Sequence, residues 1–245
     1  MGSYPYRMLV FGDLQIPHHD EELVHDWLPR VVKDVKPDTI VANGDLVDHT
    51  GLRPNEECEH TLKSEVFEMC DVLKRLRSAA GSKCKQRIRM DGNHEERIER
   101  KHAVPGYLRS AVQWRALRGT EELDKWRGFE YRKCKENIFV QGPVRVCHGW
   151  RLNHDIESIE IAEMLGGKYE GALNVFGHTH EPVLLRQCMR TRTCPMSLYW
   201  CNHGAFCDPK KMDYTKGMNT SRWGAGVMVI EHDGKQRWRN ELITP

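Results

Sequence analysis

The sequence predicts an α/β protein built around a mostly parallel sheet. In the first half of the 245-residue chain, short apolar runs alternate with longer segments of helical periodicity. This β-α-β-α-β order is typical of parallel sheets covered by helices. From residue 136 onward, the pattern changes to a series of short strand-like runs. No internal repeat or linker interrupts the chain, so we expect residues 1–245 to form one domain.

The elements of the first half follow directly from these patterns. Leu23, Trp27, Val31 and Val35 recur on one helical face, and Pro37-Asp38 marks the turn that follows. The expected order is a strand at 7–12, a helix at 21–35, a strand at 39–43, a helix at 59–80 and a strand at 86–90.

The second half contains a basic segment and then strands. Residues 83–135 hold fifteen Lys or Arg against eight Asp or Glu, and we expect residues 95–135 to be a helical, cap-like basic insertion. The expected later strands are 137–140, 144–147, 173–176, 183–187, 198–202 and 227–231.

Composition excludes a membrane-spanning chain and favours a cytoplasmic one. No apolar run approaches the roughly 18 residues that cross a bilayer, and no export signal is recognisable. The nine cysteines form no C-x-x-C pair, so reduced thiols are expected; a zinc site on Cys188, Cys194, Cys201 and Cys207 is the alternative. The net charge of +2 does not by itself indicate nucleic-acid binding.

Five short motifs place Asp, Asn or His directly after apolar, strand-like runs. They are "GDLQ" (12–15), "NGDLVD" (43–48), "DGNHEE" (91–96), "CHGW" (147–150) and "FGHTH" (176–180). The carboxyl ends of parallel strands meet at one edge of a sheet, so these side chains are expected to converge. Carboxylate, amide oxygen and imidazole together suit manganese, iron, zinc or nickel. Two such ions would activate water to hydroxide and hold the oxygens of an in-line displacement at phosphorus.

The ordered set of motifs resembles the calcineurin-like metallophosphoesterase superfamily. The matching segments run from residue 12 to residue 180, and "NHGAF" (202–206) is similar to the turn that often follows them. The resemblance implies a four-layer α/β/β/α sandwich with a dinuclear metal site at its rim. It also implies a phosphoester substrate and a metal-dependent phosphodiesterase or phosphatase, with manganese as the first expectation.

The resemblance also implies a role for each motif residue. Asp45 would bridge the two ions, and Asp13, Gln15 and His180 would complete the first site. Asn93, His148 and His178 would complete the second. His94 would face the substrate without binding metal, with Asp48 orienting it; a helix N-cap is the alternative for Asp48.

Gln15 departs from the family pattern, which usually has His at this position. The Gln15 oxygen would bind the first ion weakly, or the side chain would hydrogen-bond water beside the ion; a third alternative brings in His18 or His19 instead. His18 and His19 are otherwise expected at the rim, in reach of substrate. We expect a weaker first site and activity that depends on added metal.

The substrate class is open on sequence grounds. His49 stands where protein phosphatases of the superfamily usually carry Arg, which argues against that class. Arg97 and the basic, Trp-containing segment after "GNHEE" favour a nucleotide or nucleic acid, and His203 is expected at the same rim. A nucleic-acid-end nuclease and a non-catalytic scaffold are the alternatives.

Overall fold

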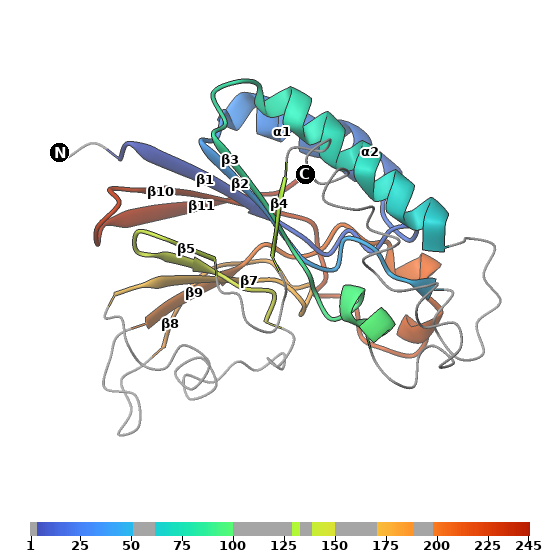
Figure 1. The fold of residues 1–245 in the computed structure, drawn as a ribbon. Helices are drawn as coiled ribbons and strands as arrows, with labels where there is room; N and C mark the ends of the chain where they lie inside the picture. The colour runs from blue at the N-terminus through green and yellow to red at the C-terminus, as the bar shows by residue number, and fades with distance from the viewer. Residues whose placement is uncertain (1–3, 51–61, 100–128, 133–138, 150–170, 189–197) are drawn as a thin grey trace.

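The computed structural model describes residues 4–50, 62–99, 129–132, 139–149, 171–188 and 198–245. They form two mixed β-sheets, with helices covering one face of the larger sheet (Figure 1). The described part is therefore an α/β structure with few helices, as the sequence predicts. None of its helices is long and apolar enough to span a lipid bilayer.

The larger sheet has six strands in the order β11-β10-β1-β2-β3-β4. Strands β1 to β4 are parallel neighbours, while β10 runs antiparallel to both β1 and β11. The strands are β1 (Tyr6–Phe11), β2 (Thr39–Asn43), β3 (Gln86–Met90), β4 (Glu130–Arg132), β10 (Val227–His232) and β11 (Trp238–Ile243).

The smaller sheet has five strands in the order β5-β6-β7-β9-β8. Strands β6, β7 and β9 are parallel, and β5 and β8 run antiparallel at the two edges. The strands are β5 (Phe139–Gln141), β6 (Val144–Val146), β7 (Leu173–Phe176), β8 (Val183–Cys188) and β9 (Leu198–Asn202).

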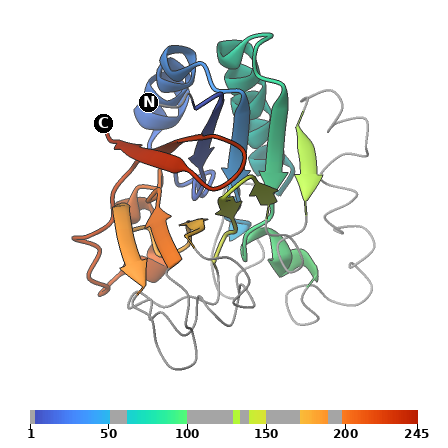
Figure 2. The same cartoon turned by 90° about the vertical axis from the view of Figure 1, so that its left-hand side faces the viewer.

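Helices pack on the outer face of the six-stranded sheet, as the turned view shows (Figure 2). A π-helical turn, η1 (Leu23–Trp27), continues into α1 (Leu28–Val35), and α2 (Leu62–Ala80) lies beside α1. Short 3₁₀ helices form η3 (Glu95–Glu99), η4 (Pro209–Lys211) and η5 (Asp213–Thr215).

Alternation along β1 explains the layered core. Leu9 and Phe11 face the helices, whereas Met8 and Val10 face the second sheet. The central strands therefore bury apolar side chains on both faces, as their continuous apolar runs indicate. Two apolar layers result, one under the helices and one between the sheets.

Several expectations need correction or lie outside the described residues. Residues 130–132 form β4, which pairs with β3, although we expected helix throughout 95–135. Only η3 and β4 of that insertion are described, so its basic helical character stays a prediction. Within the described ranges, no helix covers the outer face of the smaller sheet, and the fourth layer of the sandwich stays a prediction.

Candidate metal centre

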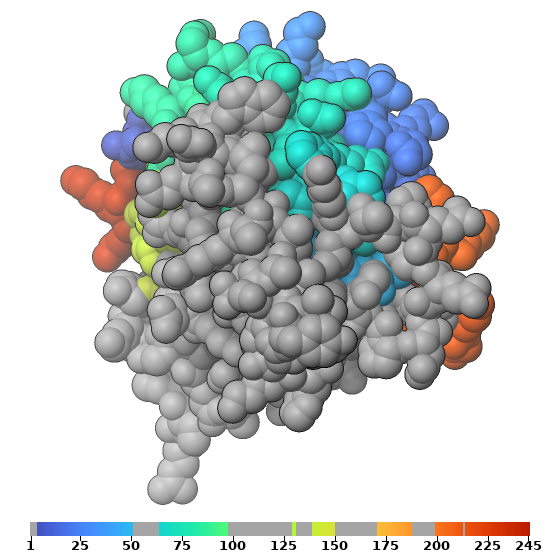
Figure 3. All heavy atoms as spheres, turned by 45° about the vertical axis from the view of Figure 1, so that its right-hand side comes forward, coloured from blue at the N-terminus to red at the C-terminus, as the bar shows by residue number. Residues whose placement is uncertain are grey.

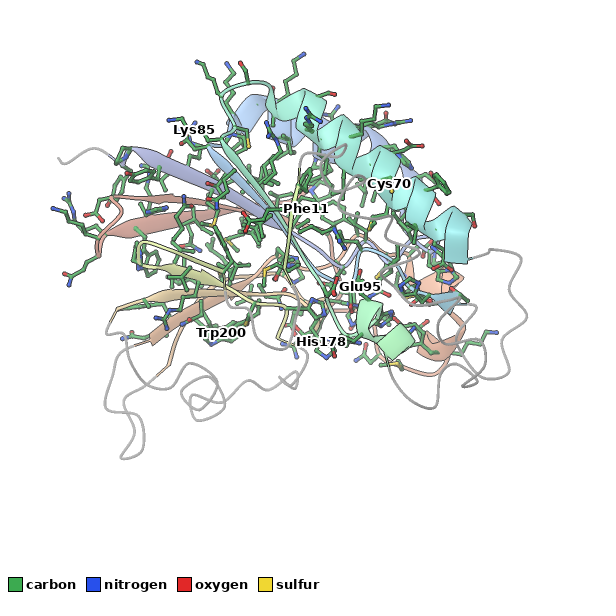
Figure 4. All side chains as sticks on the ribbon, in the orientation of Figure 1. Phe11, Cys70, Lys85, Glu95, His178 and Trp200 are labelled. Carbon is green, nitrogen blue, oxygen red and sulfur yellow. The ribbon has the colours of Figure 1, made fainter. Side chains whose placement is uncertain are left out.

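The motif loops leave their strands at the same end of both sheets. Asp13 and Asp45 each lie two residues beyond β1 and β2, and His148 and His178 lie two residues beyond β6 and β7. In Figure 4, Glu95 and His178 lie near one another at this end, although Glu95 is in η3, after β3 of the larger sheet, and His178 follows β7 of the smaller one. The convergence expected from the sequence is therefore present.

Backbone hydrogen bonds hold the first two loops side by side. The Asp13 N–H donates to Gly44 O at 3.0 Å, and the Gln15 N–H donates to Asp45 O at 3.0 Å. The two sheets are also joined here, because the Asn43 amide donates to Cys147 O at 3.0 Å. These bonds fix the separation of Asp13 and Asp45 without any ligand.

Asp13 lies at the centre of one group of side chains. Its Oδ1 is 3.2 Å from His180 Nε2, and its carboxylate accepts the His178 backbone N–H at 3.0 Å. His203 Nε2 lies 4.0 Å from Asp13 Oδ2. All three contacts come from the second sheet's loops, so Asp13 links the sheets electrostatically.

Asp45 lies at the centre of the other group. Its Oδ2 is 3.1 Å from His148 Nε2, which also lies 3.2 Å from Asn93 Oδ1. His148 Nδ1 donates to Asn43 O at 2.8 Å, which leaves Nε2 as the free ligand atom. Asp45, His148 and His178 each offer one donor atom, and these atoms lie within 4.8 Å of one another.

Gln15 is fully buried between these groups. Its Nε2 donates to Asp45 Oδ2 at 3.2 Å, and its Oε1 has no hydrogen-bond partner within the described part of the chain. A buried carbonyl oxygen without a donor costs free energy, and a cation would satisfy it. If the amide turned over, Oε1 would lie about 3 Å from Asp45 Oδ2, the spacing of adjacent ligands on an ion with bonds of about 2.1 Å.

The backbone at the site adopts left-handed conformations. Non-glycine residues rarely have positive φ, because Cβ then meets the backbone. In the described ranges seven such residues occur, and only Lys36 lies away from the motif loops. The others are Asp13, Gln15, Asp45, His49, His178 and His180. Strained backbone concentrated in one place is a feature of functional sites.

Two glycines make room for the carboxylates. A Cβ at Gly92 would overlap Asp45 Oδ1, and one at Gly177 would overlap Asp13 Oδ2. Since both carboxylates are buried and held by hydrogen bonds, neither can move aside cheaply. The glycines in these motifs are therefore required by close approach.

Burial and neighbouring charges oppose one another at Asp45. Burial would raise its pKa, but His148 and His94 outweigh that effect and hold the pKa well below the usual value. Burial would likewise lower the pKa of His148, but Asp45 and Asp13 raise it to about 10. Asp13 likewise helps to raise the pKa of His180 well above its usual value, so both carboxylates favour positive charge in this space.

His94 lies beside this group rather than within it. Its Nδ1 is 2.6 Å from Asp48 Oδ1, and its Nε2 is 2.9 Å from Arg97 Nη2 and 3.7 Å from Asp45 Oδ2. Arg97 Nη1 also donates to Asp48 O at 2.7 Å. Asp48 therefore fixes the imidazole orientation that directs Nε2 toward Arg97 and Asp45.

Glu95 is a site residue that sequence reasoning missed. Its carboxylate accepts the backbone N–H groups of Asp45, Leu46, Val47 and Gly92, at distances from 2.6 to 3.2 Å. Burial, with Asp45 and Asp91, raises the pKa of Glu95 to about 8. The position of Glu95 next to His94 in "GNHEE" could have indicated a role at the site. The sequence does not show which backbone N–H groups its carboxylate accepts.

The five residues expected to contact substrate lie in different surroundings. His18 is partly exposed and lies 2.9 Å from Thr50 Oγ1, and Arg97 contacts His94 as above. His19, His49 and His203 are fully buried. His49 faces Glu65, and His203 lies behind Asp13 and Asn43. His19 faces a separate cluster, so the substrate roles of these residues stay predictions.

The pair formed by His49 and Glu65 gives a pH-dependent stability. Burial raises the pKa of Glu65 from 4.5 to about 7. Between these values the folded chain keeps a proton that the unfolded chain has lost, so the Glu65 contribution to stability decreases as pH rises. The Gln side chain cannot ionise, so we expect Glu65→Gln to remove this decrease. The variant should then be more stable than wild type above pH 7, by at most roughly 3 kcal/mol in the free energy of unfolding.

Urea unfolding at about pH 5 and about pH 8 measures this contribution. The exposed residue Glu22 supplies the matched control, Glu22→Gln. Glu65→Gln should gain stability relative to wild type only at the higher pH. Equal changes at both pH values would contradict the prediction.

The cysteines whose side chains the structure describes are free. Cys201 is buried in the layer between the sheets, whereas Cys207 Sγ lies 3.8 Å from His180 Nδ1. Cys194 lies outside the described residues, so the alternative zinc site is not tested. Cys70, Cys84 and Cys147 are also free and buried.

The residues present fit a pair of divalent ions. Two carboxylates, two amide side chains and the Nε2 atoms of His148 and His180 lie together here, and Gln15 Oε1 has no hydrogen-bond partner among the described residues. This mixture of oxygen and nitrogen donors suits borderline divalent metals. The arrangement can hold positive charge where a phosphoryl group would accumulate negative charge.

A comparison with known protein families agrees with this chemistry. The profile of the calcineurin-like phosphoesterase family matches residues 6–224. Among curated proteins, none matches the chain. The family match covers β1 to β9 and every motif loop described above, and we conclude that the chain belongs to the calcineurin-like phosphoesterase family, whose members are generally metal-dependent hydrolases.

Proposed function

We propose that the chain is a binuclear metal-dependent phosphohydrolase that acts on nucleotide or nucleic-acid phosphoesters. The observation that carries the proposal is the convergence of Asp13 and Asp45 with imidazoles from the other sheet. Family membership supports the same reaction class. Manganese is the first candidate metal, with iron, zinc and nickel as alternatives.

Each ion would have its own set of protein ligands. Asp45 would be shared, since its Oδ2 is near both His148 and the Gln15 amide. Asp13, Gln15 and His180 would complete the first set; Asn93, His148 and His178 would complete the second. When bound, the ions supply a nucleophile from water near neutral pH and neutralise charge on the phosphoryl oxygens.

His94 and Arg97 would act on the substrate directly. His94 Nε2 and Arg97 Nη2 lie 2.9 Å apart beside Asp45, and Asp48 holds both side chains. A phosphoryl group at this place would accept hydrogen bonds from both, and His94 could pass a proton to the leaving oxygen. His18, which is 3.5 Å from Asp48 Oδ2, lies close enough to contact the same substrate.

Aromatic side chains beside the centre support a substrate with a base. The His180 ring centroid lies 4.2 Å from that of Trp223, and the His94 centroid lies 6.5 Å from that of Tyr214. Tyr214 is 37% exposed, so its ring is accessible for stacking. The two tryptophans of the basic segment after "GNHEE", Trp114 and Trp126, lie outside the described residues.

Paired substrates test the proposal. We expect turnover of bis-p-nitrophenyl phosphate or p-nitrophenyl phosphate with manganese, and its loss with chelator. Faster diester turnover would indicate a phosphodiesterase, and cleavage of labelled single-stranded DNA would identify the nuclease alternative. Absence of turnover with every candidate metal would reject the hydrolase and leave a scaffold of the same fold.

Gln15 offers a sharper prediction about the first ion. An imidazole is a better donor than an amide oxygen for borderline metals, so Gln15→His should tighten metal binding about tenfold, or ~1.4 kcal/mol. Manganese titration of activity and of the metal-free chain by calorimetry measures this change.

The exposed Gln236 gives the matched control, Gln236→His, which should leave the titration unchanged. Identical activation curves for wild type and Gln15→His would contradict a role of Gln15 beside the ion.

A further inference from the structure

A second cluster of potential metal ligands lies on the outer, helical side of the molecule. It consists of His19, Glu21, His25 and Glu68, and it shares no residue with the candidate metal centre. His19 and Glu21 lie between β1 and η1, His25 lies in η1, and Glu68 lies in α2. In Figure 3 the blue residues around η1 and α1 and the teal residues of α2 lie next to each other at the surface.

The four side chains direct their donor atoms to one point. His19 Nε2 is 3.3 Å from His25 Nε2, 3.3 Å from Glu68 Oε1 and 3.4 Å from Glu21 Oε2. His25 Nε2 is 3.2 Å from Glu21 Oε2 and 3.8 Å from Glu68 Oε1. Ligands bonded to zinc at about 2.0–2.1 Å form a tetrahedron whose edges are about 3.3–3.4 Å. The observed distances are close to those edges.

The two imidazoles are poorly satisfied without an ion. Their Nε2 atoms face each other at 3.3 Å, so protons carried on both nitrogens would lie close together between the same two carboxylates. The Nδ1 atoms of His19 and His25 are buried and make no hydrogen bond to any residue that the structure describes. His19 is fully buried, and its Nε2 is directed at the other three side chains of the cluster.

The local backbone holds His19 and His25 in place. His19 pairs with Cys207 in an isolated β-bridge, and its carbonyl accepts from Lys211 Nζ at 2.8 Å. The Asp20 carboxylate accepts the Leu23 N–H at 3.1 Å at the start of η1. π-Helical turns are rare and often occur at functional sites, and this one contains His25.

We propose that His19, Glu21, His25 and Glu68 bind one divalent ion of the zinc class in a tetrahedral, structural site. Two carboxylates neutralise the ion, and two imidazoles complete four-fold coordination, which leaves no position for substrate. The ion joins η1 to α2 and braces the loop that carries Asp13 and Gln15. The proposal does not depend on the proposed hydrolase activity.

Burial also favours the ligand form of His19. It lowers the pKa of the imidazole, although Glu68 and Glu21 act in the opposite direction. A neutral imidazole offers Nε2 as a lone-pair donor, so the metal need not displace a proton from a charged ring. The partly exposed Glu21 and Glu68 leave a path for the ion from solvent.

Zinc content of the full-length chain tests the proposal. Wild type, His25→Ala, Glu68→Gln and the exposed control Glu22→Gln would be stripped with chelator, loaded with zinc, desalted and measured for metal per chain. We expect His25→Ala and Glu68→Gln each to lose one equivalent relative to wild type, and Glu22→Gln to lose none. The test uses the difference in zinc per chain between each variant and wild type, so its outcome does not depend on whether the candidate metal centre also binds zinc.

Cobalt provides the second measurement. Tetrahedral Co²⁺ gives visible absorption bands, which should be present in wild type and Glu22→Gln and absent in His25→Ala and Glu68→Gln. Zinc content equal to wild type in both cluster variants would overturn the proposal. Equal loss in Glu22→Gln would overturn it as well, since the effect would then not belong to these ligands.

Discussion

Replacing Asp45 by Asn is expected to reduce phosphoester hydrolysis on the order of 10³-fold or more. In the wild type, the backbone N–H of His94 donates to Asp45 Oδ1 at 2.9 Å, and the side-chain oxygen of Asn can accept the same hydrogen bond. What it removes is the negative charge at Oδ2, next to His148 and Gln15. The proposed shared ligand of both ions is then neutral, so both sites weaken together.

Metal content and steady-state kinetics would be measured on the same samples. Asp26→Asn, an exposed position in η1, is the matched control and should behave as wild type. An Asp45→Asn protein with full metal content and more than a tenth of wild-type kcat/KM would contradict the shared role of Asp45.

Replacing His94 by Asn is expected to lower kcat by about 10²–10³-fold while metal content stays unchanged. His94 contacts Asp48 and Arg97 through its two ring nitrogens, but none of the expected metal ligands except Asp45, at 3.7 Å. The loss should therefore be in the chemical step. If His94 protonates the leaving oxygen, alkyl phosphoesters should suffer more than p-nitrophenyl esters, whose leaving group needs no proton.

His232, buried in β10 and stacked on Tyr6, supplies a control histidine outside the centre. His232→Asn should keep kcat near that of wild type. A His94→Asn protein that also loses one metal equivalent would show instead that His94 belongs to the ligand sets.

The strands nearest the centre were predictable, and the reason is their burial on both faces. β2 and β3 coincide with the strands expected at 39–43 and 86–90. β11 was missed because its sequence, WRNELI, has three consecutive polar residues and no alternation, and because it lies at a sheet edge, where pairing with β10 decides its conformation. β4 has only three residues, and its pairing with β3 is a long-range contact that no local pattern encodes.

Motif spacing predicted which loops meet but not where each side chain points. Consecutive residues His18 and His19 diverge, His18 toward Asp48 and His19 toward His25 and Glu68. Residues with left-handed backbone, such as Gln15, break the strand pattern in which successive side chains point to opposite faces. The direction of a side chain in these loops therefore cannot be inferred from its place in the sequence. The His25–Glu68 cluster joins residues 43 positions apart and has no motif of its own.

The position of β10 between β11 and β1 has a consequence for how the protein is made. Asp13 follows a strand that pairs on one side with β2 and on the other with residues 228–232. During translation, β1 therefore emerges from the ribosome long before its second neighbour exists, with the backbone groups of one edge unsatisfied. Until residues 227–243 are synthesised, the nascent chain exposes an unpaired strand edge to which other chains can pair. Premature termination upstream of these residues would therefore yield an aggregation-prone product.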